Sequence, residues 1–268
     1  MTRVATTLPP PPSRGGIPGL PVSSFSVDSV VQLSSSSVVD LTNSVRSGSL
    51  SWTAPRGTST WSIFTFWKKY TNQRSSKGGN NATDSIGNGS WIVDHFSAHG
   101  GKRITDFFDQ YVISDAETQS LVRSVGNYGR SLSRITSWVL LICVAWEDSM
   151  EHLATLYWTP GFLQQFEEAR GYSLVNYLPL LYNANSSWSQ EFPAYSERYT
   201  YGNSTTDELY NLDYRATLNE GYQEYVRHFS AWSHSKGISY RAQPAYNLPL
   251  QMVRTSMYQF ITISDNHG

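Results

Sequence analysis

The chain has 268 residues, which is enough for one large domain or two small ones. Its 20 Lys and Arg residues against 21 Asp and Glu leave a formal net charge of −1, and this balance disfavours a nucleic-acid binder that relies on charge. Only 15% of the residues are charged, whereas 14% are aromatic. This composition is typical of secreted proteins that bind uncharged ligands, although a large aromatic core explains it equally well.

The cysteine and hydropathy patterns argue against disulfide-linked, zinc-binding and membrane-spanning proteins. Cys143 is the only cysteine, so no disulfide can form within the chain. No group of Cys and His residues has the spacing of a zinc site, and this pattern predicts no metal centre. The longest apolar run, residues 138–146, is about half as long as a membrane-spanning helix requires. We therefore predict neither a membrane nor a nucleic acid as a partner.

The N-terminus and the glycosylation sequons give opposite indications about secretion. Arg3 is followed by prolines and glycines where a signal peptide carries an apolar stretch, so no signal peptide is visible. Four Asn-x-Ser/Thr sequons in polar stretches nevertheless favour a secreted, extracellular glycoprotein, and one explanation is that the true N-terminus is missing. The four candidate glycosylation sites are Asn81, Asn88, Asn185 and Asn203.

In chain order, three regions precede or form the predicted domain. Residues 1–37 are rich in Pro, Gly and Ser, which predicts a disordered, low-complexity segment or a linker. Residues 38–80 predict a short β segment, with a strand over residues 61–67 that is rich in aromatic and β-branched side chains. Residues 81–252 then alternate helix and strand signals, which predicts an α/β fold.

The first two predicted helices lie at residues 101–113 and 114–126. The first carries apolar residues at helical spacing, and the second begins at the cap residue Ser114 and ends at Gly126. The apolar face of the first helix consists of Ile104, Phe107, Phe108 and Tyr111.

The third predicted helix follows Thr159-Pro160 and ends at Gly171, and the longest runs from about Leu212 to Ser235. Gly237 closes the longest helix, and a strand over residues 238–242 follows it. Strand, helix and strand at this spacing predict βαβ units and a parallel sheet. The predicted inward-facing residues are Phe162, Leu163 and Phe166 on the third helix, and Leu218, Tyr222, Tyr225, Phe229 and Trp232 on the longest.

The most informative candidate site is an acidic run, in which Glu147, Asp148 and Glu151 lie within five residues beside Trp146 and Trp158. If the run ends a strand, Glu147 and Glu151 point to one side and Asp148 to the other. A carboxyl group against aromatic rings has a raised pKa, which suits a general acid. The simpler alternative is a solvated acidic loop or the first turn of a helix.

Two further pairs follow predicted strands. Asp94 and His95 come after an apolar run, where an Asp that caps the next turn is the more common case. Gln243 and Tyr246 follow the last strand, and an amide and an aromatic ring there are good sugar ligands but also ordinary loop residues. The sequence carries no nucleophile elbow, phosphate loop or dinucleotide motif.

These residues carry a resemblance to a known family. The runs at residues 146–151, 158–162, 170–174 and 177–179 resemble glycoside hydrolase family 106, the α-L-rhamnosidases, and look closest to its fungal secreted relatives. The likeness covers most of residues 38–252. It implies a catalytic (β/α)8 barrel of the TIM type, of which residues 81–252 would form a part, and cleavage of terminal rhamnosyl residues from plant polysaccharides or glycosides.

The resemblance also implies roles for the candidate residues. Glu151 corresponds to the general acid of the family's Asp-Ser-x-Glu motif. Family members can bind calcium near the site, with Glu147 or Asp148 as oxygen ligands, and no other cofactor is implied. The residues expected to contact the oligosaccharide or glycoside are Asp94, His95, Glu147, Asp148, Trp158, Gln243 and Tyr246.

The chain departs from the family pattern in two places. Residues 130–145 interrupt the expected junction, and residues 253–268 replace the later strand that carries the catalytic base, so we expect translated introns in an incomplete fragment. Inverting hydrolysis needs two carboxyl groups about 6.5–9.5 Å apart. We therefore expect poor solubility and no measurable hydrolysis from this chain. The alternatives are a carbohydrate-binding or degenerate protein without catalysis, and a secreted structural protein.

Overall fold

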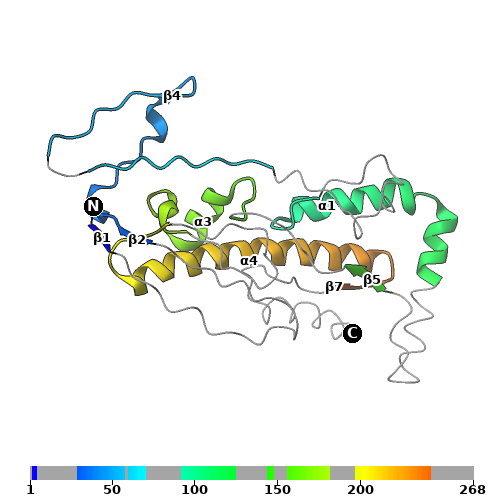
Figure 1. The fold of residues 1–268 in the computed structure, drawn as a ribbon. Helices are drawn as coiled ribbons and strands as arrows, with labels where there is room; N and C mark the ends of the chain where they lie inside the picture. Colours follow the sequence, from blue (N-terminus) through cyan, green and yellow to red (C-terminus); the bar gives the residue numbers. More distant parts are fainter. Residues whose placement is uncertain are drawn as a thin grey trace, which may run out of the picture. The chain divides into compact units, whose positions relative to one another are not determined.

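The computed structural model of the chain contains two compact units. The first unit comprises Met1–Lys69 and Thr155–Thr217, and the second comprises Tyr70–Ala154 and Leu218–Gly268. One long helix, α4 (Ser204–Ser235), contributes residues to both units (Figure 1). The structure describes residues 2–4, 29–57, 60–70, 92–124, 144–147, 156–181 and 197–242.

The sheet of the first unit has the order β1-β2-β6, where β1 is Thr2–Val4, β2 is Ser29–Gln32 and β6 is Glu197–Thr200. β2 pairs antiparallel with β1 and parallel with β6. The β-branched side chain of Val31 in β2 is 1% exposed. Part of residues 1–37, for which the composition predicts disorder, therefore forms ordered strands, and the 3-10 helix η1 (Ser35–Ser37) follows them.

The predicted β segment forms a smaller structure than expected. A 3-10 helix, η2 (Thr42–Ser44), leads into a hairpin of β3 (Val45–Arg46) and β4 (Ser49–Leu50). The turn residues Ser47 and Gly48 have φ values of 49° and 76°, as a tight hairpin turn requires.

The strand predicted over residues 61–67 does not form, because residues 60–70 carry no strand pairing in the structure. The side chains make ring contacts instead, and the ring of Phe64 packs edge-on against that of Tyr199 in β6, with centroids 4.9 Å apart. Aromatic residues favour strands only where a neighbouring backbone is available in register. Their enrichment in this segment therefore predicted the wrong conformation.

Helix α3 (Phe162–Arg170) ends at Gly171, as predicted, and the 3-10 helix η5 (Val175–Leu180) follows it. Gly171 caps the helix with a φ of 77°, a conformation that glycine adopts without strain. Phe162 and Phe166 are 1% and 0% exposed, so two of the three predicted inward-facing residues are confirmed. Leu163 is 38% exposed, and its prediction is wrong.

Helix α4 begins at Ser204 instead of about Leu212, because Asn203 caps it. The Asn203 side-chain oxygen accepts hydrogen bonds from the backbone N–H groups of Thr205 and Thr206 at 3.1 and 3.2 Å. The predicted apolar stripe is confirmed over most of its length. Its buried members are Leu218, Tyr222, Tyr225 and Phe229, whereas Trp232 at the end is half-buried.

In the second unit, α1 (Ala98–Phe107) continues as a π-helical turn, η4 (Phe108–Val112), over the predicted first helix. Its predicted apolar face is largely exposed, with Phe107 at 45% and Tyr111 at 65%. Small residues pack inward instead. A Cβ atom at Gly101 would lie 3.1 Å from the ring of His228 in α4, so glycine permits the close approach of the two helices.

A second helix of this unit covers residues 116–124. Asp115, and not the predicted Ser114, is its capping residue, because its carboxylate accepts hydrogen bonds from the backbone N–H and the hydroxyl of Thr118, both at 2.8 Å. The described part of the helix ends short of the predicted Gly126.

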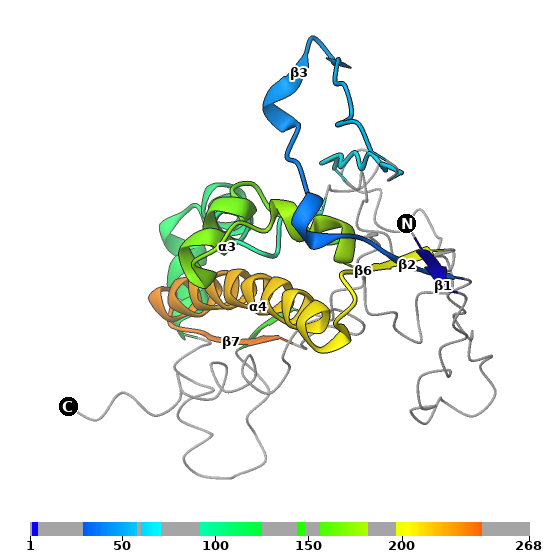
Figure 2. The same ribbon diagram turned by 90° about the vertical axis from the view of Figure 1, so that its left-hand side faces the viewer.

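β5 (Val144–Glu147) and β7 (Ser239–Ala242) pair in parallel, as the strand–helix–strand order predicts for a strand at 238–242. Both strands lie along the C-terminal part of α4 (Figures 1 and 2). The first two residues of β5, Val144 and Ala145, belong to the expected insert 130–145.

Among the described residues, the strands form three separate sheets of three, two and two strands. The (β/α)8 barrel therefore stays a prediction. No helix in this part of the chain is long and apolar enough to cross a membrane.

Candidate active site

Four side chains from four different segments meet at the last residue of β5 in the second unit. Glu147 ends β5, Tyr225 lies in α4, Tyr240 lies in β7, and His95 lies in the turn that precedes α1. We call this group the Glu147 cluster. It brings together two residues that the sequence predicts to be functional, Glu147 and His95.

The Glu147 carboxylate accepts hydrogen bonds at both oxygen atoms. The Tyr225 hydroxyl donates to Oε1 at 2.5 Å, and the Tyr240 hydroxyl donates to Oε2. His95 Nε2 lies 3.5 Å from Oε1, within ion-pair distance when the ring is protonated. The Glu147 and His95 side chains are 22% and 12% exposed. A largely buried carboxylate thus has hydrogen-bonding partners on three sides, as burial of a charge requires.

The orientation of Glu147 follows from the pleat of the strand. Parallel pairing places Glu147 opposite Ala242 and Ala145 opposite Tyr240, and alternate residues of a strand share one face. That face is turned toward α4, because the Tyr240 ring stacks on Phe229 with centroids 5.4 Å apart. Glu147 therefore points into the layer between the β5–β7 pair and α4.

His95 is held by a second contact. Its Nδ1 atom lies 2.9 Å from the carbonyl oxygen of Val93, and because a carbonyl can only accept, Nδ1 carries the hydrogen. Its ring packs against that of Tyr225 with centroids 4.7 Å apart. These contacts direct Nε2 at Glu147, and protonation of the ring gives Nε2 an N–H toward the carboxylate.

The charges of the cluster follow from this geometry. Burial acts to raise the pKa of Glu147, but the hydrogen bonds from His95, Tyr225 and Tyr240 outweigh it, so the pKa lies below its ordinary value. Burial and the adjacent carboxylate raise the pKa values of Tyr225 and Tyr240 above their ordinary range. At neutral pH the site therefore holds an ionised carboxylate and two neutral hydroxyl donors. A general acid needs a raised pKa, and Glu147 has the opposite shift.

Two other predicted residues have local contacts of their own. Asp94 accepts hydrogen bonds from the backbone N–H of Phe96 and the hydroxyl of Ser97, both at 2.9 Å, so it stabilises the turn before α1. Trp158, in the first unit, packs its ring against Phe162 with centroids 4.5 Å apart. Neither contact tests a role in binding a sugar.

Asn203 is the one predicted glycosylation site in the described part of the chain, and it is exposed at the start of α4. Tyr225 and Tyr240 were predicted only as parts of a helix and a strand. A hydroxyl on an otherwise apolar stripe was the one available signal, since a buried tyrosine needs a partner for its polar tip. The remaining predicted residues lie outside the described residues, namely Asn81, Asn88, Asp148, Glu151, Asn185, Gln243 and Tyr246.

Comparison with known families shows which family the chain belongs to. The family model described as alpha-L-rhamnosidase, that of glycoside hydrolase family 106, matches residues 21–243. The chain belongs to glycoside hydrolase family 106. The match contains the whole Glu147 cluster and the acidic run at residues 147–151, and it confirms the resemblance derived from the sequence.

The chain is also similar to a longer protein. It is 33% identical over 98 residues to a protein of Formosa agariphila named "Putative beta-glucuronidase", a match that covers 36% of this chain and 7% of that relative. The chain therefore spans a small part of the length of this relative. No solved structure matches the chain.

The calcium site that family membership implies can be compared with the described residues. Both oxygen atoms of Glu147 accept hydrogen bonds from tyrosine hydroxyls, and His95 Nε2 lies 3.5 Å from Oε1. These donors compete with a cation for the carboxylate, although each oxygen has a second lone pair. Within the described segments, no group of three or more His, Cys, Asp or Glu side chains could hold a metal ion.

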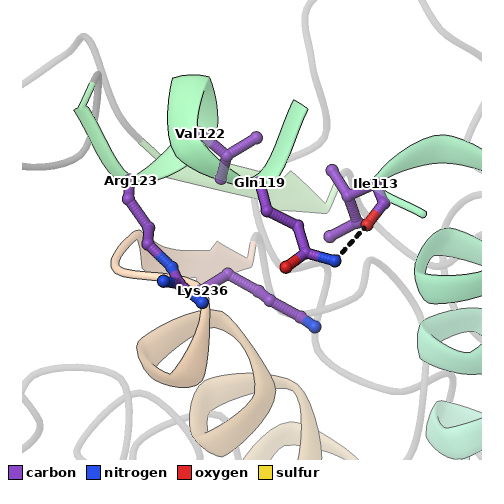
Figure 3. Close-up of a pocket in the computed structure, with 5 residues that line it drawn as sticks. All are labelled: Ile113, Gln119, Val122, Arg123 and Lys236. Atoms are coloured by element: carbon purple, nitrogen blue, oxygen red, sulfur yellow. Dashed lines mark hydrogen bonds between the residues drawn. The ribbon is translucent and has the colours of Figure 1, made fainter. Parts of the chain in front are cut away.

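A small hollow elsewhere in the second unit lacks the features of a sugar site. Ile113, Gln119, Val122, Arg123 and Lys236 line it, and it is partly open to solvent (Figure 3). The Gln119 side chain donates to the carbonyl oxygen of Ile113 at 3.2 Å, at its edge. The lining contains neither a carboxylate nor an aromatic ring, so general acid chemistry and stacking on a sugar are both missing there.

Proposed function

We propose that the chain forms part of the catalytic domain of a secreted α-L-rhamnosidase-like enzyme, which hydrolyses terminal rhamnosyl residues of plant polysaccharides or glycosides. The observation that carries this proposal is the family match over residues 21–243, which includes the acidic run at 147–151. The charge-poor, aromatic-rich composition supports an uncharged sugar as the substrate. The sequons support secretion.

In this proposal Glu151 is the general acid that protonates the leaving glycosidic oxygen. A second carboxylate activates water on the opposite face of the sugar ring. Glu147 is unsuited to the acid's role because its pKa is lowered and both its oxygens are hydrogen-bonded. Of the two remaining carboxylates, Asp148 and Glu151, the resemblance to the family's Asp-Ser-x-Glu motif assigns the acid's role to Glu151.

A second candidate function has an observation in its favour. Glu147, the described carboxylate nearest to the motif, is bound by two tyrosines and held ionised, so it supplies neither a free base nor a general acid. A chain that binds the sugar without hydrolysing it needs neither group, and it is the second candidate. Binding and turnover must therefore be measured separately.

The test compares the wild-type chain with Glu151→Gln on two rhamnosides, one with an aryl and one with an alkyl leaving group. Hydrolysis by the wild type would also overturn the expectation, drawn from the sequence, that this chain has no measurable activity. A general acid contributes about 10²–10⁴-fold to the rate, and the alkyl substrate, with its poorer leaving group, should lose the most. Glu168→Gln, an exposed carboxylate on α3, is the matched control and should keep full activity. Equal activity of Glu151→Gln and wild type on the alkyl substrate would remove Glu151 from the mechanism. Rhamnose-induced changes in tryptophan fluorescence without turnover would favour the second candidate.

A further inference from the structure

We infer that Glu147 is a positioning residue, whose carboxylate fixes the end of β5 against α4 and β7 and thereby sets where the acidic run 148–151 begins. In this role it contacts neither the sugar nor a cation. The importance of the run for hydrolysis rests on the proposed function, whereas the attachment of β5 does not.

Strand β5 needs such an attachment because it has few backbone partners in the described part of the chain. Among the described strands, β5 pairs with β7 alone, over four residues, and the pairing ends at Glu147 opposite Ala242. A two-stranded sheet is marginally stable on its own. The side-chain bonds of Glu147 act at the last paired residue, where the strand would otherwise separate first.

The hydrogen-bond donors to Glu147 come from distant parts of the chain. Tyr225 and Tyr240 are 78 and 93 positions from Glu147 in the chain, and they belong to the helix and to the strand that pack against β5. One carboxylate therefore joins three elements. The raised pKa values of both tyrosines keep their hydroxyl groups protonated, so both continue to donate over the whole physiological pH range.

The rings of both donor tyrosines are held by packing. The Tyr225 ring packs on Phe229 with centroids 5.0 Å apart, and Phe229 stacks on Tyr240 at 5.4 Å. Tyr225 is 0% exposed and Tyr240 is 6% exposed. A sugar hydroxyl that bonded to Glu147 would have to displace one of these packed rings, so direct recognition of the sugar by Glu147 is disfavoured.

The first experiment measures hydrogen exchange in the Tyr225→Phe/Tyr240→Phe double variant, which keeps both rings and removes both donors. Amides of β5 should exchange at least tenfold faster than in the wild type, while amides of α3 change less than twofold. Tyr214→Phe is the matched control, since it removes a buried α4 hydroxyl that donates to the Tyr157 carbonyl at 2.7 Å in the first unit. This control should leave the exchange rates of the β5 amides unchanged. Unchanged β5 exchange in the double variant, or equal acceleration in α3, would overturn the inference.

The second experiment separates positioning from contact with the sugar. In Glu147→Gln, the Kd for an aryl rhamnoside, read from tryptophan fluorescence, should stay within twofold of the wild type, while kcat falls at least tenfold. A tenfold rise in Kd would show that Glu147 touches the sugar and would overturn the inference. A wild-type chain that neither binds nor hydrolyses the rhamnoside would refute the proposed function, and the exchange result would then still decide whether Glu147 holds β5.

Discussion

The contact between Gly221 of α4 and the turn that carries His95 gives a sharp prediction for Gly221→Ala. A Cβ atom at this position would lie 3.0 Å from the carbonyl carbon of Phe96 and closer still to its oxygen. These are backbone atoms, so they cannot rotate away as a side chain can. The substitution must therefore push the turn off the helix, and with it His95, which immediately precedes Phe96.

The size of the effect is a difference between two opposing contributions. Alanine favours a helix over glycine by about 1 kcal/mol. Overpacking costs about 1–3 kcal/mol, and the upper value applies because the obstructing atoms are backbone. The net expectation is a loss of about 2 kcal/mol in the free energy of unfolding.

Urea unfolding of the wild type and Gly221→Ala measures this loss. Gly101→Ala is the matched control, because its Cβ would meet the ring of His228 at 3.1 Å, and a side chain can shift. For this control the helix preference offsets the crowding, and the expected change is within about 0.5 kcal/mol. If Gly221→Ala is as stable as the wild type, the close packing of Phe96 on α4 is refuted.

Two further predictions concern the free energy of unfolding. The lowered pKa of Glu147 means that its carboxylate stabilises the folded state above the ordinary pKa of 4.5 and loses this effect as the pH falls through the folded-state pKa. The difference in the free energy of unfolding between wild type and Glu147→Gln, measured by urea unfolding, should therefore shrink as the pH is lowered from 6 to strongly acidic conditions. A difference that stays constant would contradict the lowered pKa of Glu147. Phe166→Ala removes a ring that is 0% exposed and should cost about 3–5 kcal/mol, whereas Leu163→Ala, at 38% exposure, should cost less than about 1 kcal/mol. Equal losses would show that α3 buries a different face.

The sequence predicts those features of the fold that depend on local chemistry. Gly171 ends α3 because glycine accepts a positive φ, and the stripe on α4 is buried because its residues recur at helical spacing. The exposed face of α1 shows the limit of this reasoning. Periodicity shows that Phe107 and Tyr111 share a face, but not which face is covered. Gly101 on another face allows α4 to approach there instead.

The candidate site was predictable in part for the same reason. Glu147 and His95 stand out as polar residues beside apolar runs, which is a local signal. Their partners, Tyr225 and Tyr240, lie 78 and 93 positions from Glu147, and neither spacing nor composition relates residues so far apart. Only the packing of α4 on the β5–β7 pair brings them together.

The Glu147 cluster also bears on why three carboxylates occur within five residues. A carboxylate that is held ionised, as the lowered pKa of Glu147 indicates, disfavours ionisation of any carboxyl group close to it. This raises the neighbour's pKa, which is the direction that a general acid requires. If the run folds so that the proposed acid, Glu151, lies within a few ångströms of Glu147, the charge of Glu147 would support that acid as well as fixing the end of β5.

This electrostatic role can be tested through the pH dependence of hydrolysis. The basic limb of kcat/KM reports the group that must be protonated, which is Glu151 in the proposed mechanism. Glu147→Gln removes the neighbouring charge, so the basic limb should move to lower pH. Tyr240→Phe keeps the charge and removes one hydrogen bond to it, so it should lower kcat without moving the limb to lower pH. A basic limb at the same pH in Glu147→Gln and wild type would show that the two carboxyl groups are electrostatically independent, and the concentration of acidic residues would then need another explanation.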